Sequence, residues 1–136
     1  MWFLQYILCV FLFFYLPISV KAGERVETHR QCQADPKTKL EDDLIHKLQT
    51  GEKVNDPIIG KHMLCMFTKM HIMNENGDID AEVLRTKAQR ALQDQDKLDA
   101  LVKRCSVKEP GSAEDAAIQL LKCIEKDVPI IKHQST

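Results

Sequence analysis

The five cysteines are the residues of this chain whose type and spacing most directly indicate chemistry. Cys9 lies inside an apolar N-terminal run, and Cys32, Cys65, Cys105 and Cys123 are separated from one another by 33, 40 and 18 positions. Zinc sites are typically built from close cysteine pairs such as Cys-x-x-Cys, which these spacings do not contain. Four cysteines in an exported chain predict two disulfides, and the sequence leaves all three connectivities open.

A calcium-binding loop is the second chemistry to weigh, in the segment from Asn74 to Asp80. Part of this segment matches the spacing of an EF-hand loop, with Gly77 as the sixth loop residue. The first and twelfth positions then fall on Ile72 and Val83, where the ion requires carboxylates. The sequence therefore predicts a turn here and no metal site.

Enzymes and nucleic-acid-binding proteins are excluded by what the chain lacks. It has no nucleophile elbow, no His-Glu-x-x-His motif, no phosphate-binding loop and no free cysteine near a histidine. When Lys21 is removed with the N-terminal segment, the 19 Lys and Arg fall to 18 against 20 Asp and Glu. No basic stripe or aromatic platform for bases is present. We predict neither an enzyme nor a nucleic-acid partner, and no cofactor.

The N-terminus predicts export. Residues Trp2 to Leu16 carry no charge, and Val20 and Ala22 are small residues at the spacing that signal peptidase reads. We predict a signal peptide over residues 1–22 and one mature domain over residues 23–136. No Lys or Arg precedes the apolar run, so an uncleaved membrane anchor is the alternative.

Helical periodicity dominates the remaining sequence and predicts an all-α fold of about six short helices. Residues 24–32 form a weak, polar candidate. Five stronger helices are expected: from Asp35-Pro36 to Gly51, from Asp56-Pro57 to about Ile72, after Asp80 through Leu92, after Asp94 or Asp96, and after Ser112.

The helix from Pro57 has two apolar faces and is expected to be central. Cys65 and Ile72 fall on one side at 100° per residue. The opposite quadrant contains four methionines and an isoleucine: Ile59, Met63, Met66, Met70 and Met73. Phe67 is the only Phe, Tyr or Trp after residue 22, so the apolar surface of the domain must be mostly aliphatic.

Six short helices with cysteines in the first, third, fifth and sixth resemble the insect odorant-binding and pheromone-binding family. The resemblance covers essentially the whole mature chain. That family has six cysteines, with the second four residues before the third and the fifth nine residues from both the fourth and the sixth. The four cysteines present here align as the first, third, fourth and sixth, which puts the two absent ones at Lys61 and Glu114. The chain is thus similar to the four-cysteine subgroup.

This resemblance implies that Cys32 pairs with Cys65 and that Cys105 pairs with Cys123. It also implies that Lys61 and Glu114 are neighbours, since the cysteines at their positions are partners in the family. Their opposite charges suggest an ion pair in place of the lost disulfide. Two unrelated, solvated charges are the alternative interpretation.

The resemblance further implies an apolar cavity and the function of a secreted carrier of small apolar ligands such as odorants or pheromones. Flexible methionines would suit aliphatic ligands, although a methionine stripe is also typical of an ordinary core. The ligand-contact residues expected on this basis are Ile59, Met63, Met66, Phe67, Met70, Met73, Leu84, Ala88, Leu98, Val102, Leu120, Ile124 and Val128.

Three further hypotheses concern regulation, partners and a rival function. Acid-dependent release would require some of the five histidines to be buried, and the short apolar tail from Val128 to Ile131 would suit a lid. Candidate partners are the apolar ligand, a membrane receptor and a second copy of the chain, in an extracellular fluid such as sensillar lymph or haemolymph. The rival is a secreted signalling, defence or venom protein that acts through an exposed apolar patch.

Overall fold

The computed structural model of the protein describes residues 23–128. The expected signal peptide over residues 1–22 and most of the apolar tail lie outside this range. Within it the structure has six α-helices and no strand, as predicted. They are α2 (Glu24–Ala34), α3 (Asp42–Gln49), α4 (Pro57–Lys69), α5 (Ala81–Ala88), α6 (Gln95–Cys105) and α7 (Ala113–Glu125).

Four helices begin where the sequence predicts a capping side chain. Asp56 accepts a hydrogen bond from the Ile58 amide of α4, and Asp80 accepts two at the start of α5. Asp94, rather than Asp96, caps α6. Ser112 and Asp115 form a capping box at the start of α7. Each cap satisfies backbone amides that have no partner within the helix, which is why these boundaries are readable from local sequence.

The start predicted for α3 at Asp35-Pro36 is wrong, because the helix begins only at Asp42. Asp35 accepts a hydrogen bond from the Lys37 amide and forms a local turn instead. Thr38 then donates its hydroxyl to the Cys32 carbonyl at the end of α2. These side-chain bonds satisfy the backbone in a bend, and they compete with the helix at this point.

The end predicted for α4 at about Ile72 is also wrong, because α4 ends at Lys69. His71 has a left-handed φ of 60°. The amides of Ile72 and Met73 both donate to the Phe67 carbonyl, so the chain folds back under the helix. Met73 and Ile72 are both buried in this loop rather than on opposite helix faces.

Helix α5 likewise stops at Ala88, short of the predicted Leu92. The amides of Ala91 and Leu92 both donate to the Ala88 carbonyl in a closing turn. Within residues 23–128 no helix is long and apolar enough to cross a lipid bilayer.

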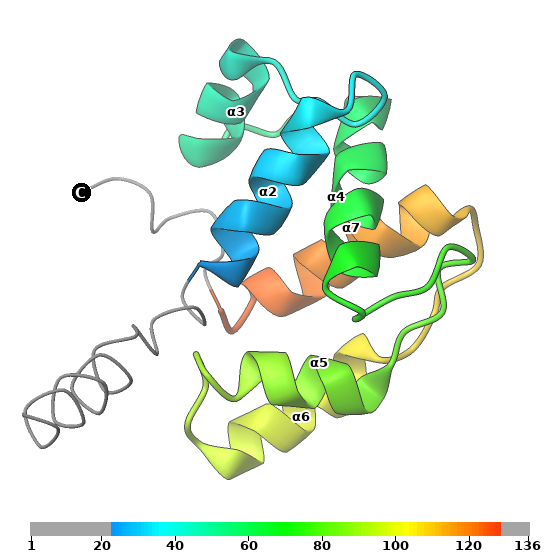
Figure 1. Ribbon diagram of the computed structural model, residues 1–136. Helices are drawn as coiled ribbons and strands as arrows, with labels where there is room; N and C mark the ends of the chain where they lie inside the picture. Colours follow the sequence, from blue (N-terminus) through cyan, green and yellow to red (C-terminus); the bar gives the residue numbers. More distant parts are fainter. Residues whose placement is uncertain (1–22, 129–136) are drawn as a thin grey trace, which may run out of the picture.

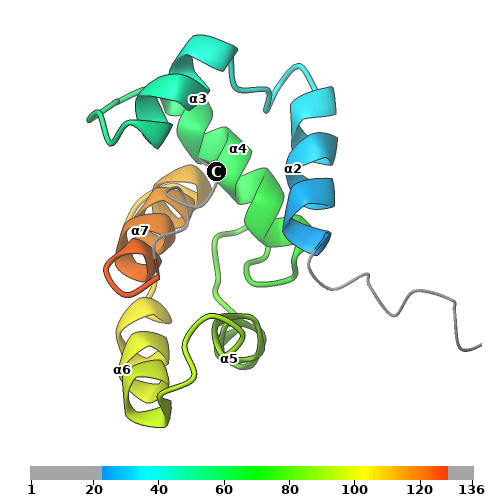
Figure 2. The same ribbon diagram turned by 90° about the vertical axis from the view of Figure 1, so that its left-hand side faces the viewer.

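The helices pack around α4 and α7, which make the most extensive contact of the fold. Helix α2 lies against α4, and α6 links α5 to α7. Figures 1 and 2 show the pair α5 and α6 at one end of the molecule, with α3 at the other.

Two disulfides join these helices in the pairing that the family resemblance implies. Cys32 of α2 is bonded to Cys65 of α4, with their Cα atoms 6.0 Å apart. Cys105 of α6 is bonded to Cys123 of α7, with a Cα separation of 5.6 Å.

The apolar interior consists of a large and a small cluster. The large cluster lies among α4, α5, α6 and α7, and Leu101 and Ala117 at its centre are fully buried. The small one consists of Leu40, Leu44 of α3 and Ile59 of α4. Met63 on α4 is partly buried and packs against both clusters. Met63 therefore connects them.

Helices α4 and α7 are in close contact at Gly60. A Cβ atom built there would lie 3.0 Å from the Glu114 Cβ and 3.1 Å from the Ile118 Cδ1. The neighbouring Lys61 side chain points to solvent, and no ion pair among the described residues joins it to Glu114. The two sites lie at one helix crossing, but the hypothesis of a replacing ion pair gains no support.

The close contact at Gly60 leads to a prediction about stability. We expect Gly60→Ala to lower the free energy of unfolding by about 1 to 2 kcal/mol, because overpacking costs more than the helix propensity that alanine contributes. Urea unfolding followed by far-UV circular dichroism measures this. The control is Lys61→Ala at the adjacent exposed position, for which a change within about 0.5 kcal/mol is expected. An unchanged or raised midpoint for Gly60→Ala would contradict the close approach.

Candidate ligand-binding cleft

A half-open cleft of about 880 Å³ lies between the segment after α3 and the outer face of α7. Gly51, with a φ of 79°, ends α3 and turns the chain across the molecule. The segment from Thr50 to Asn55 forms one wall until the Asp56 cap starts α4. Its apolar lining consists of Leu48, Val54, Ile59, Ile118 and Leu121.

Charged side chains lie around this aliphatic lining. Glu52, Lys53 and Asp56 come from the loop wall, and Lys122 comes from α7. These four are exposed. Glu125 at the end of α7 differs, because it is half-buried and burial raises the pKa of its carboxyl.

Of the thirteen ligand-contact residues predicted from the family resemblance, Ile59 lines the cleft. Met63 and Val128 are partly buried and pack against the large cluster. The other ten are buried members of that cluster: Met66, Phe67, Met70, Met73, Leu84, Ala88, Leu98, Val102, Leu120 and Ile124. The fold thus brings twelve of the thirteen around one apolar centre, and their contact with a ligand stays a prediction.

Sequence reasoning missed four of the apolar residues in the cleft. Leu48 and Leu121 belong to recognisable helical stripes, and that signal indicates burial without indicating a cleft. Val54 lies in a loop, and Ile118 lies at the edge of the buried stripe of α7. No local pattern distinguishes these two, since the cleft forms only when α7 packs beside the loop.

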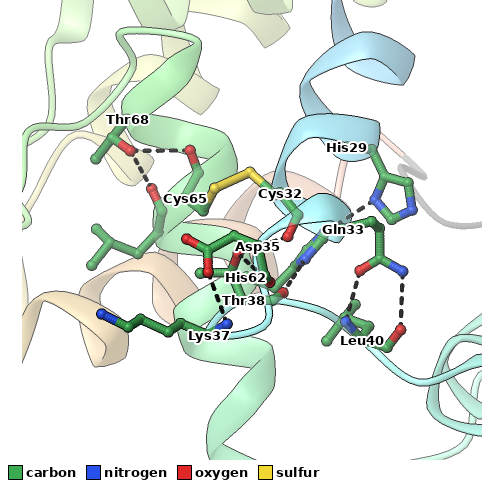
Figure 3. Close-up of a disulfide and its surroundings, with 11 residues drawn as sticks. His29, Cys32, Gln33, Asp35, Lys37, Thr38, Leu40, His62, Cys65 and Thr68 are labelled. Atoms are coloured by element: carbon green, nitrogen blue, oxygen red, sulfur yellow. Dashed lines mark hydrogen bonds between the residues drawn. A yellow bond between two sulfur atoms is a disulfide. The ribbon is translucent and has the colours of Figure 1, made fainter.

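A chain of hydrogen bonds between α2 and α4 holds the connection that leads to α3 (Figure 3). The Nδ1 atom of His62 lies 2.7 Å from the Thr38 carbonyl oxygen, which only accepts, so this nitrogen carries the proton. In neutral His62 the Nε2 atom then accepts from His29 Nδ1 at 3.0 Å. Burial lowers the pKa of both imidazoles, and their mutual repulsion adds to this for His62.

Gln33 of α2 provides a second anchor for the same connection. Its side-chain amide donates to the Leu40 carbonyl at 2.9 Å and its oxygen accepts from the Leu40 amide at 2.7 Å. Leu40 is thereby held in the small cluster on which α3 rests. The two anchors position α3, and with it the wall of the cleft that follows α3.

The segment from Asn74 to Asp80, which partly matches a calcium loop, is held by hydrogen bonds within the segment. The side-chain oxygen of Asn74 accepts from the amides of Asn76 and Asp78, and its nitrogen donates to the Asp78 carboxylate. Lys108 forms an ion pair with Asp78. In residues 23–128 no group of three or more metal-ligating side chains is brought together.

The fold and the cleft define a class of protein: a small, disulfide-linked helical protein with a cleft lined by aliphatic side chains. The PBP/GOBP family model matches residues 22–127, and the chain belongs to this family. Proteins of this family are secreted carriers of small ligands. The chain is accordingly a small ligand-binding protein and not an enzyme.

Two curated relatives are similar over most of their length. The B1 protein of Tenebrio molitor is 32% identical over 118 residues, which cover 84% of this chain and 90% of that protein. The B2 protein of the same species is 31% identical over 118 residues and is covered to 91%.

Solved structures show the same fold at lower identity. An odorant-binding protein of Locusta migratoria superposes with a TM-score of 0.63 at 16% identity, covering 83% of this chain and 84% of that one. Odorant binding protein 5 of Apis mellifera superposes with a TM-score of 0.64 at 15% identity, covering 87% of this chain and 97% of that one.

Proposed function

We propose that this protein is a secreted carrier that binds small aliphatic molecules and transports them through an extracellular aqueous fluid. The uncharged apolar run at the N-terminus and membership in a family of secreted carriers support export. The observation that carries the proposal is the aliphatic cleft between the loop wall and α7.

The ligand is proposed to enter through this cleft and to extend along α4 toward Met63. Ile59 lines the cleft, and Met63, one helical turn further on, packs against both apolar clusters. Methionine side chains adapt readily to ligands of different shapes. Burial of ligand surface contributes about 25 cal/mol per Å², less the cost of immobilising the ligand.

Aliphatic ligands are expected to bind better than planar aromatic ligands of equal surface area. The cleft contains no aromatic side chain among its described residues. Phe67, the single candidate for stacking, is only 3% exposed inside the large cluster. Edge or face contacts with aromatic rings are therefore not available to distinguish aromatic ligands.

The rival function, a protein that acts through an exposed apolar patch, finds less support. Val26 on α2 and Val107 after α6 are the large apolar side chains that are exposed among the described residues. They lie on different elements and are the only two such side chains in this range. Protein-binding patches are typically contiguous and larger.

Displacement of a fluorescent apolar probe, N-phenyl-naphthylamine, tests the carrier function and its site. We expect saturable one-to-one binding and displacement by a long-chain alcohol. Ile118→Asp is expected to weaken probe and alcohol binding at least tenfold, because it places a charge within the aliphatic lining. Val54→Asp, on the opposite wall, should have the same effect and replaces the first variant if that one fails to fold.

The matched control is Val107→Asp, which introduces the same charge at a position 62% exposed and outside the cleft. Its affinities should equal those of the unaltered protein. Equal binding by all folded variants would show that the ligand does not use this cleft. Absence of saturable probe binding by the unaltered protein would contradict the carrier function itself.

A further inference from the structure

Glu125 places a half-buried carboxyl in the cleft. It is the last residue of α7 and belongs to the lining of the cleft. Its side chain is half-buried and forms no hydrogen bond or ion pair with another of the described residues 23–128. A carboxyl group that is partly shielded from water loses hydrogen bonds to water, so a ligand that supplies a donor is favoured there.

We propose that the cleft selects aliphatic molecules whose polar end donates a hydrogen bond, a primary alcohol or an alkylammonium, and that Glu125 accepts this bond. This inference rests on the proposed carrier function and adds the ligand's chemical class and a specificity-determining residue. The tail of the ligand would lie against the aliphatic lining, which includes Leu121 one turn before Glu125 on the same helix.

The end of α7 adds to this preference. Helix C-termini carry a partial negative charge from their unpaired carbonyl groups, and this charge favours cations and donors. A fatty acid would bring its carboxylate toward both Glu125 and this helix end. An ester or an alkane would bury the Glu125 carboxyl without giving it a donor.

The basic side chains of the cleft oppose this preference only weakly. Lys53 and Lys122 are exposed, as are the acidic Glu52 and Asp56 on the same rim. Exposed charges interact through water, and each such pair contributes about 0 to 1 kcal/mol. Glu125 is the charged group of the described lining that is half-buried rather than exposed, so it contributes most to recognition of the ligand's polar end.

Acidification should separate the two kinds of donor. Burial raises the pKa of Glu125, so its carboxyl is protonated at a higher pH than an ordinary glutamate. An alkylammonium then loses its ion pair, whereas an alcohol keeps an acceptor in the carboxyl oxygen. The other charged groups of the cleft, Glu52, Lys53, Asp56 and Lys122, are exposed on its rim.

A series of ligands that share a nine-carbon chain tests the inference: nonylamine, nonanol, methyl nonanoate and nonanoic acid. The affinity of each is measured by displacement of N-phenyl-naphthylamine at neutral pH. We expect nonylamine and nonanol to bind more tightly than the ester and the acid. Glu125→Gln should weaken nonylamine binding about tenfold and leave the ester unchanged. Glu125→Leu, which removes the acceptor, should weaken nonanol binding as well.

Glu109→Gln is the control, because Glu109 is an exposed glutamate outside the cleft, and it should leave the whole series unchanged. Tightest binding of nonanoic acid, or an unchanged ratio of amine to ester affinity in Glu125→Gln, would overturn the role of Glu125. Failure of all four ligands to displace the probe would instead contradict the proposed carrier function. The two failures are therefore distinguishable.

Discussion

Replacement of Cys32 and Cys65 together by serine is expected to lower the free energy of unfolding by about 3 to 4 kcal/mol. This disulfide joins residues that are 33 positions apart. A cross-link across a loop of this length lowers the conformational entropy of the unfolded chain, which destabilises the unfolded state by about this amount. Cys105→Ser with Cys123→Ser, at a separation of 18 residues, is expected to cost about 3 kcal/mol. Chemical denaturation of both double variants measures these values.

The two disulfides should differ more in where the structure opens than in total stability. Helix α2 buries only Thr28 and Cys32 of its eleven residues, so little apolar packing holds it in place. Its other attachments are polar, and one is the ion pair of Glu24 with Lys87 of α5. Such a pair contributes about 0 to 1 kcal/mol. Without the Cys32–Cys65 bond, α2 is expected to detach while the large cluster stays folded.

Hydrogen exchange of the backbone amides distinguishes these outcomes. In the Cys32→Ser, Cys65→Ser variant, protection should be lost in α2 before it is lost in α7. In the Cys105→Ser, Cys123→Ser variant, α6 and α7 should exchange together, since each contributes several side chains to the large cluster. Wild-type protection of α2 in the first variant would show that packing, rather than the disulfide, holds this helix.

His62→Ala is expected to lower the free energy of unfolding by about 3 kcal/mol at pH 8. The imidazole is 1% exposed and donates to the Thr38 carbonyl. Its removal leaves that carbonyl without a donor, at about 1 to 3 kcal/mol, and adds a cavity where the ring was. His46→Ala on the exposed face of α3 is the control and should change stability by less than about 0.5 kcal/mol.

The same imidazoles should make stability dependent on pH. Burial lowers the pKa of His29 and His62 in the folded protein, from an unfolded value of 6.5. The unfolded state therefore binds more protons in this range, so stability is complete above pH 6.5 and falls as the pH decreases toward the lowered values. Glu125 acts in the opposite direction, because its pKa is raised on folding.

Denaturation midpoints between pH 8 and pH 5 test this dependence. The unaltered protein should lose stability on acidification, and His62→Ala should lose less, because one of the two imidazoles with a lowered pKa is gone. Parallel pH curves for the two proteins would contradict the assignment. If stability shows the expected pH dependence, acid also weakens the anchor between His62 and the connection to α3, which positions the loop wall of the cleft.

The local sequence predicts where four of the helices begin. The caps at Asp56, Asp80, Asp94 and Ser112 act on amides within three residues of themselves, so their effect is visible without tertiary structure. The family resemblance was likewise recognisable from the spacing of the cysteines and two substituted positions. The ends of α4 and α5 could not be predicted in this way. Helix α4 ends where the chain folds back to bury Met73, and α5 ends in a closing turn at Ala88.

Only the tertiary structure determined the cleft and the histidine pair. Val54 and Ile118 are 64 positions apart and become opposite walls of the cleft because α7 packs across α4 at Gly60. His29 and His62 meet because a disulfide holds α2 against α4 one turn away from each of them. Helix caps depend on neighbours in sequence, whereas binding sites depend on distant segments whose contact is settled by the packing of the whole domain.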